Sequence, residues 1–562
     1  MDDKSLKYPF NYGAIPKEEA IDREDSTSLS KFIQVLIQLR YRMLLTVSIT
    51  VLIIMTTVLI SQQRSSISMK FKGKDRLPDS TSWIMIEPKT KAMHFHAQLV
   101  DHFNPNDDRT WSHPYFVSSD YFAGPGNPIF VIIGGEGPIT RILYPFVTKR
   151  LAYEFHGFVI QTEHRFYGAS QPVGHDPSTL EMMHLFTPEQ AISDYIRIIQ
   201  SVQVELGCSL SRESPKYCPV VTVGASYPGF LSAIMRLNFS HVVDVAYAAS
   251  APMILNAHHE NEDTNAYFDH VSNVAERAWP GCANGTRETL KALYDDILLT
   301  GVKDMADNLG ICYHRIPEYM KASVETFGRE LSQLVVSINA DANMEFYPPS
   351  EDTYVTKLCK IFCNNGVSHR QRYADFLLAV MESDDYQDAK PTTDRCFDFQ
   401  TQLPDGMNAT ISSADWSGAG FSTTATRWEF QVCKDLVIKA GFAGPNSMFY
   451  PPREWTLDWL TEHCHNRFGT TLMPQPGRMN HLWSFDNLEG SSHIIFTNGE
   501  NDGWIKGSYT HSSTDAVIVI NFGNGSHHSD LTHEWPRDDT SDIVEGHERI
   551  VQTLRKWLRS IY

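Results

Sequence analysis

The chain has 562 residues, more than one compact domain usually holds, so we expect at least two folded units. Its 48 basic and 67 acidic residues give a formal charge of −19. This balance argues against a nucleic-acid-binding protein, because such proteins usually present a basic face. Apolar residues make up 42% of the chain, which is enough to bury a large core.

An uncharged, mostly apolar segment lies at residues 43–60. As a helix these 18 residues would span about 27 Å, close to the hydrocarbon thickness of a bilayer. The segment is longer and starts later than the apolar core of a cleaved signal peptide. We therefore expect a transmembrane signal anchor, with a cytosolic tail at 1–42 before it and a stalk at 61–90 after it.

Cysteines and glycosylation motifs indicate an oxidising compartment. All nine cysteines lie between Cys208 and Cys464, and none of their spacings completes a zinc-site pattern. We therefore expect no metal and no other cofactor, but disulfides of open connectivity with one cysteine left over. Glycosylation motifs at Asn238, Asn284 and Asn408 also favour such a compartment. The sequence thus predicts a single-pass membrane protein with a lumenal or extracellular catalytic part, in a lysosome or vacuole, another endomembrane or the cell surface.

Strand and helix patterns alternate after the stalk. Short apolar runs predict buried strands at 128–133, 158–160, 219–223 and 242–248. Helical patterns between them favour a doubly wound, mostly parallel sheet. Helical spacing then dominates, and strand patterns return at 493–496 and 516–520. We expect an α/β core formed by 91–254 and 421–562, with a mainly helical cap inserted at 255–420.

A candidate nucleophile follows the third strand. Ser226 comes directly after Gly224 and Ala225, and small residues there permit a sharp turn into a helix. Such an elbow exposes a serine, which becomes nucleophilic only with a base and an orienting acid nearby. Pro228 stands where the usual Gly-x-Ser-x-Gly pattern has its last glycine, so the motif is incomplete.

The acid and the base are expected after the last two strands. In this kind of fold the order along the chain is serine, acid, histidine. Asp502 follows the first of these strands and His527 follows the second. Glu500 and His528 are the alternatives for the two roles.

Two backbone N–H groups are expected to stabilise an oxyanion. The glycine-rich turn after the first strand offers that of Gly135, and the residue after the nucleophile offers that of Tyr227. The turn lacks the Gly-Lys-Ser/Thr of a phosphate loop, which argues against a nucleotide site.

Seven stretches, in this order, resemble the family of lysosomal Pro-Xaa carboxypeptidase, dipeptidyl peptidase II and thymus-specific serine protease. They are Gln98–Asn104, Gly134–Pro138, Glu163–Gly168, Gly224–Gly229, Trp428–Cys433, Asn498–Trp504 and His527–His528. The resemblance runs from about residue 95 to residue 562. It implies an α/β-hydrolase core with a helical insertion over the active site.

The resemblance also implies residue roles. Ser226 matches the family's nucleophile, Asp502 its acid and His527 its base. Trp504 matches a tryptophan that helps line the pocket for proline, and Phe230 stands beside that pocket. Cleavage next to proline in short peptides, usually at a free chain end, is implied as well.

Two further positions bear on this pattern. Gly503 stands where the family usually has proline. The glycosylation motif at Asn524 would place a glycan three residues from His527, so we expect that motif to be unused.

The sequence therefore predicts a serine exopeptidase that cleaves next to proline through an acyl-enzyme. Short peptides are the expected partners, a membrane is contacted through the anchor, no nucleic acid is bound, and a homodimer is left open. The alternatives are an esterase or lipase on the same core and a catalytically silent surface binding protein. Action at the carboxyl end and action at the amino end of a peptide are both open at this point.

Overall fold

Eight strands form one sheet in the computed structural model, which describes residues 88–258, 262–382, 396–398, 423–512, 514–532 and 539–561. The strands are β1 (Lys91–Leu99), β2 (Thr110–Ser118), β3 (Ile129–Ile132), β4 (Phe158–Thr162), β5 (Val220–Ala225), β6 (Val245–Ala249), β7 (Ile494–Gly499) and β8 (Val517–Phe522). Their order is β1-β2-β4-β3-β5-β6-β7-β8. β2 pairs antiparallel with β1 and β4, and the other pairs are parallel. This topology is that of an α/β-hydrolase core.

The central strands are apolar throughout because both faces of the sheet are covered. All four residues of β3 are buried. Ile129 and Val131 belong to the core on one face, and Phe130 and Ile132 belong to the core on the other. A parallel strand between two layers of helices has this unbroken apolar pattern.

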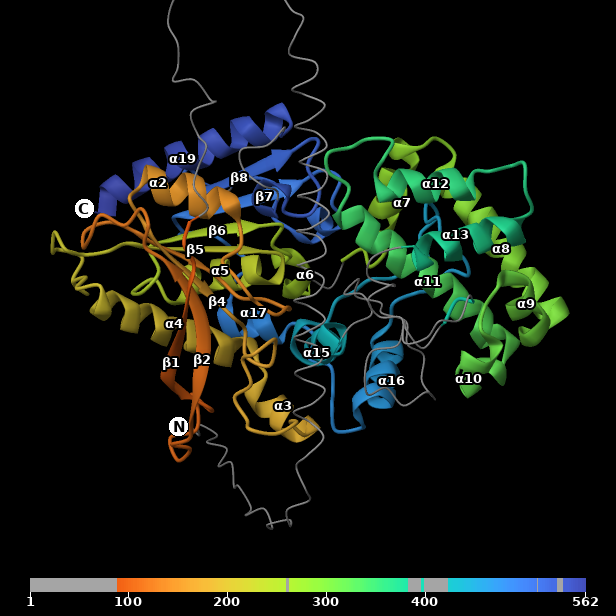
Figure 1. The fold of residues 1–562 in the computed structure, drawn as a ribbon, viewed down its shortest axis with the longest axis horizontal. Helices are drawn as coiled ribbons and strands as arrows, with labels where there is room; N and C mark the ends of the chain where they lie inside the picture. Colours follow the sequence, from red (N-terminus) through yellow and green to blue (C-terminus); the bar gives the residue numbers. More distant parts are fainter. Residues whose placement is uncertain are drawn as a thin grey trace, which may run out of the picture. The chain divides into compact units, whose positions relative to one another are not determined.

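Helices lie on both faces of the sheet (Figure 1). α4 (Pro188–Glu205) and α5 (Tyr227–Asn238) contribute to one core, and α19 (Ser541–Ile561) contributes to the other. Local signals start these helices: the hydroxyl of Thr187 accepts the N–H of Gln190 at 3.3 Å, at the start of α4. In α19 the buried residues recur every three or four positions, which turns one apolar stripe toward the sheet.

A mainly helical insertion leaves the sheet after β6 and returns at β7 (Figure 1). Its longer helices are α7 (Ala266–Ala278), α8 (Cys282–Thr300), α11 (Val324–Met344), α13 (His369–Met381) and α16 (Leu457–Phe468). Shorter ones are α6 (Met253–Ala257), α9 (Val302–Leu309), α10 (Glu318–Lys321), α12 (Tyr354–Phe362), α15 (Thr423–Gln431) and α17 (Arg478–Trp483). Core and insertion belong to one compact unit, Trp83–Tyr562. The boundaries at 255 and 420 stay predictions.

Four disulfides confirm the expected oxidised cysteines. They are Cys208–Cys218, Cys282–Cys359, Cys312–Cys396 and Cys433–Cys464. Cys363 is the cysteine left over. Three of the four bonds tie together parts of the long excursion between β6 and β7, whose described residues contribute no strand to the sheet.

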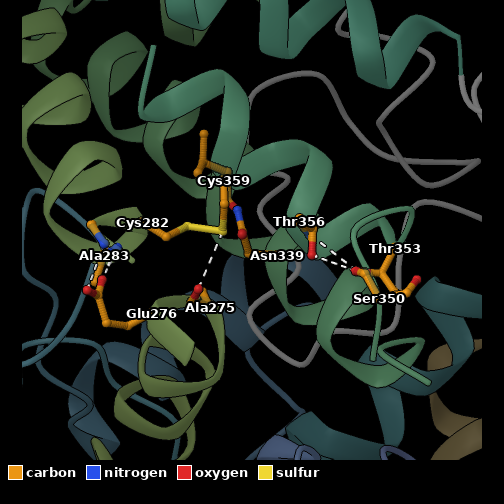
Figure 2. The surroundings of a disulfide bond; sticks show 11 residues. Ala275, Glu276, Cys282, Ala283, Asn339, Ser350, Thr353, Thr356 and Cys359 are labelled. Carbon is orange, nitrogen blue, oxygen red and sulfur yellow. Dashed lines mark hydrogen bonds between the residues drawn. A yellow bond between two sulfur atoms is a disulfide. The ribbon is translucent and has the colours of Figure 1, made fainter. Parts of the chain in front are cut away.

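Figure 2 shows how the bond between Cys282 and Cys359 joins α8 to α12. The carboxylate of Glu276, at the end of α7, accepts the N–H groups of Gly281 at 2.7 Å and Ala283 at 3.1 Å. These N–H groups belong to the start of α8 and have no partner within the helix, so the carboxylate caps it. The disulfide and the cap together hold three helices of the insertion in one arrangement.

The predicted fold class is corrected in one respect, because it included a membrane-spanning helix at 43–60. Among the residues that the structure describes, no helix is long and apolar enough to cross a bilayer. The predicted tail at 1–42, the segment 43–60 and nearly all of the stalk at 61–90 lie outside those residues. The described residues form an α/β-hydrolase core with a helical insertion.

The ion pair of Arg165 and Asp194 is completely buried between β1, β4 and α4. Arg165 Nε and Asp194 Oδ2 are 2.6 Å apart, and the guanidinium also donates to the carbonyls of Val100 and Leu185. His102 Nε2 lies 2.7 Å from Asp194 Oδ1. Burial alone would raise the pKa of Asp194, but Arg165 and His102 lower it to about 2. The pair explains the arginine of the stretch 163–168 as a structural residue.

We predict that Asp194→Asn lowers the free energy of unfolding by about 3–5 kcal/mol, because it leaves the buried guanidinium of Arg165 without a charge partner. Chemical denaturation measures this. Asp295→Asn, which removes the exposed pair with Lys291 (2.9 Å), should change the same quantity far less, because water screens that pair. Equal effects of the two substitutions would contradict the assignment.

The same pair predicts a pH dependence with a defined sign. The folded-state pKa of Asp194 is depressed to about 2, below the value of about 3.9 for an unfolded chain. The stabilising contribution of Asp194 is therefore present above about pH 4 and is lost as the pH falls toward about 2. In Asp194→Asn, this part of the acid-induced loss of stability should be absent.

Candidate active site

A sharp turn at Ser226 joins β5 to α5. Ser226 has φ 60° and ψ −129°, a backbone conformation that residues other than glycine rarely adopt. Its N–H donates to the carbonyl of Ala249 on the neighbouring β6 at 2.8 Å. The turn sets the half-buried side chain of Ser226 at the carboxyl end of a central strand, where this fold presents a nucleophile.

Glycines permit the turn because no side chain fits at their positions. A Cβ at Gly224 would lie 2.1 Å from the carbonyl oxygen of Pro228, and a Cβ at Gly229 would lie 2.8 Å from that of Ala249. A Cβ at Gly135 would lie 2.2 Å from Cγ of Pro228. The proline that interrupts the usual motif therefore packs against the glycine-rich loop after β3.

That loop is held from below by three side chains. The N–H of Gly134 donates to the hydroxyl of Thr162 at 3.0 Å, and its carbonyl accepts the hydroxyl of Tyr195 at 3.0 Å. At the other end, Glu163 Oε1 accepts the N–H of Ile139 at 2.8 Å. Burial raises the pKa of Glu163. These bonds hold the loop in place, as the expected oxyanion donor at Gly135 would require.

Asp502 and His527 meet at the carboxyl ends of the neighbouring strands β7 and β8. Asp502 Oδ2 lies 2.7 Å from His527 Nδ1, and Asp502 Oδ1 accepts the N–H of Trp504 at 2.9 Å. Both side chains are buried, with Asp502 at 0% and His527 at 8% exposure. Because Nδ1 is paired, Nε2 is the ring nitrogen left for proton transfer, and it has no hydrogen-bond partner among the described residues.

The end of α11, a helix of the insertion, holds the loops of both residues. The amide of Asn343 donates to the carbonyl of Asn501 at 2.8 Å and accepts the N–H of Gly503 at 2.9 Å. The carbonyl of Met344 accepts the N–H of His527 at 3.2 Å. The insertion is therefore part of the framework of the site as well as a cover.

These contacts explain why the chain has Gly503 where the resembling family usually has proline. A proline has no N–H to donate to Asn343. A Cβ at Gly503 would also lie 2.7 Å from Cε2 of Tyr267, a residue of α7. The position is shaped by the insertion, so the departure leaves Asp502 and its partners in place.

A buried hydrogen-bond chain fixes the side chain of Tyr227. His164 Nδ1 bonds to the carbonyl of Arg165 at 2.7 Å, so its Nε2 accepts the hydroxyl of Tyr227 at 3.1 Å. Gln431 donates to the Tyr227 hydroxyl at 3.1 Å and accepts that of Tyr167 at 2.7 Å. Burial lowers the pKa of His164 to about 4, which keeps its ring neutral at higher pH. The chain links α15 to the residue that follows the nucleophile.

A narrow pocket opens beside the nucleophile. Its lining consists of Ser226, Tyr227, Pro252, Leu255, Asn256, Trp428, Ile438 and Trp504. The ring of Trp504 lies 4.7 Å from that of Tyr267 and 6.3 Å from that of His527, between centroids. Sequence reasoning named Trp504 and missed Trp428 and Asn256. The stretch 428–433 was the available signal for Trp428, whereas nothing in the sequence distinguishes Asn256.

Other predicted site residues lie elsewhere. Phe230 is fully buried in α5, with its ring 5.1 Å from that of Phe485, and it does not line the pocket. Glu500 is exposed, and the ring of His528 lies 4.4 Å from that of His527. No group of histidine, cysteine, aspartate or glutamate side chains in the described part of the chain is arranged to hold a metal ion.

The glycosylation sites stay predictions. Asn238 and Asn284 are exposed, Asn408 lies outside the described residues, and Asn524 is exposed with Nδ2 at 3.2 Å from Oδ1 of Asp542.

Comparison with known proteins shows the family. Residues 98–550 match the serine carboxypeptidase S28 family. The chain belongs to this family and is a serine-type peptidase. The resemblance predicted from the seven stretches is confirmed.

The curated relatives match nearly along their whole length. Lysosomal Pro-X carboxypeptidase of Mus musculus is 26% identical over 484 residues, which cover 83% of this chain and 89% of that protein. The Homo sapiens protein of the same name is 23% identical over 507 residues, with coverages of 88% and 94%. Thymus-specific serine protease of Homo sapiens is 26% identical over 484 residues, with coverages of 82% and 86%.

The contact of Gly135 with Pro228 predicts a sharp difference within one loop. Gly135→Ala should lower kcat by about 100-fold, because the added methyl group pushes the loop and its N–H away from the developing oxyanion. Gly137→Ala, two residues on, is the matched control, since a Cβ there meets nothing within 4 Å. Steady-state hydrolysis of a short peptide by both variants measures the effect. A loss of similar size in both would contradict this role for Gly135.

Proposed function

We propose that this peptidase removes the residue that follows a proline at the carboxyl end of short peptides. Ser226 is the nucleophile, His527 the base and Asp502 the acid. The observation that supports this most is the 2.7 Å contact between Asp502 and His527. These residues follow β7 and β8, which run parallel to β5, the strand that ends before Ser226. The family's description and the names of the Pro-X carboxypeptidase relatives support the carboxyl-terminal direction.

The chemistry follows from these groups. Ser226 Oγ attacks the carbonyl carbon of the proline while its proton passes to His527 Nε2. Asp502 keeps Nδ1 protonated and stabilises the imidazolium, and the N–H groups of Gly135 and Tyr227 stabilise the oxyanion. The imidazolium then gives its proton to the leaving amino group. Water, activated by the same imidazole, hydrolyses the acyl-enzyme and frees the serine.

The pocket beside Ser226 supports proline as the residue before the cleaved bond. Trp428 and Trp504 are large aromatic side chains, and Leu255 and Ile438 add aliphatic surface. Such walls favour a compact apolar ring over a charged or flexible side chain. Phe230 contributes indirectly, through its packing within α5.

The protein functions in a lumenal compartment such as the lysosome. The relatives named lysosomal and the four disulfides support it. The exposed positions of Asn238 and Asn284 are compatible with glycosylation there. Membrane attachment and a homodimer find no support in the part of the chain that the structure describes.

We predict that Ser226→Ala abolishes both covalent labelling by a fluorophosphonate and peptide hydrolysis, because the hydroxyl that attacks the probe and the substrate is gone. Ser211→Ala, at an exposed serine before β5, should be labelled like the unchanged protein.

Mass analysis of products from a peptide library tests at which end of a peptide the enzyme cleaves. Loss of single carboxyl-terminal residues after proline is expected, and release of amino-terminal dipeptides would contradict it. Hydrolysis of acyl esters alone would favour the esterase alternative.

A further inference from the structure

The pocket beside Ser226 contains one polar side chain whose function the proposed reaction leaves unexplained. Asn256 lies on α6, is only 4% exposed and lines this pocket. Its backbone N–H bonds to the carbonyl of Pro252. Its side-chain amide makes no hydrogen bond to another described residue and is not among the fully buried polar groups. The amide therefore faces the open space of the pocket, where a ligand atom can pair with it.

Two other polar groups of the lining already have partners. The hydroxyl of Tyr227 is bonded to His164 and Gln431. The indole N–H of Trp504 contacts the sulfur of Met344 at 3.3 Å. The amide of Asn256 therefore adds a donor and an acceptor that these groups do not supply.

A plain proline ring would leave that amide unpaired, because the ring carries only carbon and hydrogen beyond its backbone nitrogen. A pocket with flat aromatic walls and one amide suits a ring that carries a hydroxyl group. Hydroxyproline combines these features: it keeps the shape and the tertiary amide of proline, and its hydroxyl can donate to or accept from an amide. A site built to bind a substrate hydroxyl discriminates against the analogue that lacks it.

We propose that Asn256 is a specificity-determining residue that hydrogen-bonds the hydroxyl of 4-hydroxyproline before the cleaved bond. The enzyme then prefers collagen-type peptides over peptides with plain proline. This inference rests on the proposed function, because it takes the pocket to hold the residue before that bond.

The experiment compares two blocked peptides that differ only in having proline or 4-hydroxyproline before a carboxyl-terminal phenylalanine. In the unchanged protein, kcat/KM should be about fivefold higher for the hydroxyproline peptide, the size expected for one hydrogen bond. In Asn256→Leu, which keeps the volume and removes the amide, this ratio should fall to about one or below. Leu255→Met, a change in the apolar wall, should keep the ratio above one.

A ratio of one or less in the unchanged protein would overturn the inference. An unchanged ratio in Asn256→Leu would do the same, and an equal loss for both peptides would show that Asn256 binds the peptide backbone instead. Fluorophosphonate labelling of each variant checks that the site is intact. Labelled protein that cleaves neither peptide would refute the proposed function itself, whereas cleavage of both without a preference would refute this inference alone.

Discussion

The whole site depends on a backbone conformation at Ser226 that is unfavourable by itself. A residue held at φ 60° costs about 1–3 kcal/mol and persists only where the surroundings enforce it. Here the enforcement is steric and mutual. Pro228 fills the space that a Cβ would need at Gly224 and at Gly135, so the turn at Ser226 and the glycine-rich loop after β3 are packed as one unit. This contact accounts for the proline that makes the motif look incomplete.

The other half of the site depends on the insertion. Asp502 and His527 sit on loops that follow adjacent strands, but both loops are bonded to the end of α11. On the opposite side, Gln431 of α15 reaches the hydroxyl of Tyr227. Movement of these helices relative to the sheet would therefore displace Asp502 and His527, the proposed acid and base. The insertion therefore holds the site in place together with the sheet.

Much of the core could be predicted because burial on both faces leaves a simple apolar pattern. The runs that became β3, β5 and β7 are of this kind, and the order of serine, acid and histidine follows from them. β1 and β2 gave no such pattern, since only part of each strand is buried and β2 contains Pro114. Strands at the antiparallel edge keep polar residues, so their pattern resembles that of a loop.

Contacts between distant segments could not be predicted. Asn343 and Gly503 are 160 residues apart, and no spacing rule relates them. The same holds for Asn256, an ordinary residue of a five-residue helix until the fold places it beside Ser226. The expected membrane-spanning helix rests on an apolar run of suitable length alone, and the helices of the described residues give it no support.

The proposed reaction requires that Ser226 forms an acyl-enzyme with a peptide that ends in proline. Rapid acid quenching during turnover of a Pro-Xaa peptide, followed by digestion and mass spectrometry, would detect this intermediate. The digest fragment containing Ser226 should carry the added mass of the peptide without its last residue. Turnover with an adduct on another residue, or with no adduct when deacylation has been slowed at low pH, would contradict it.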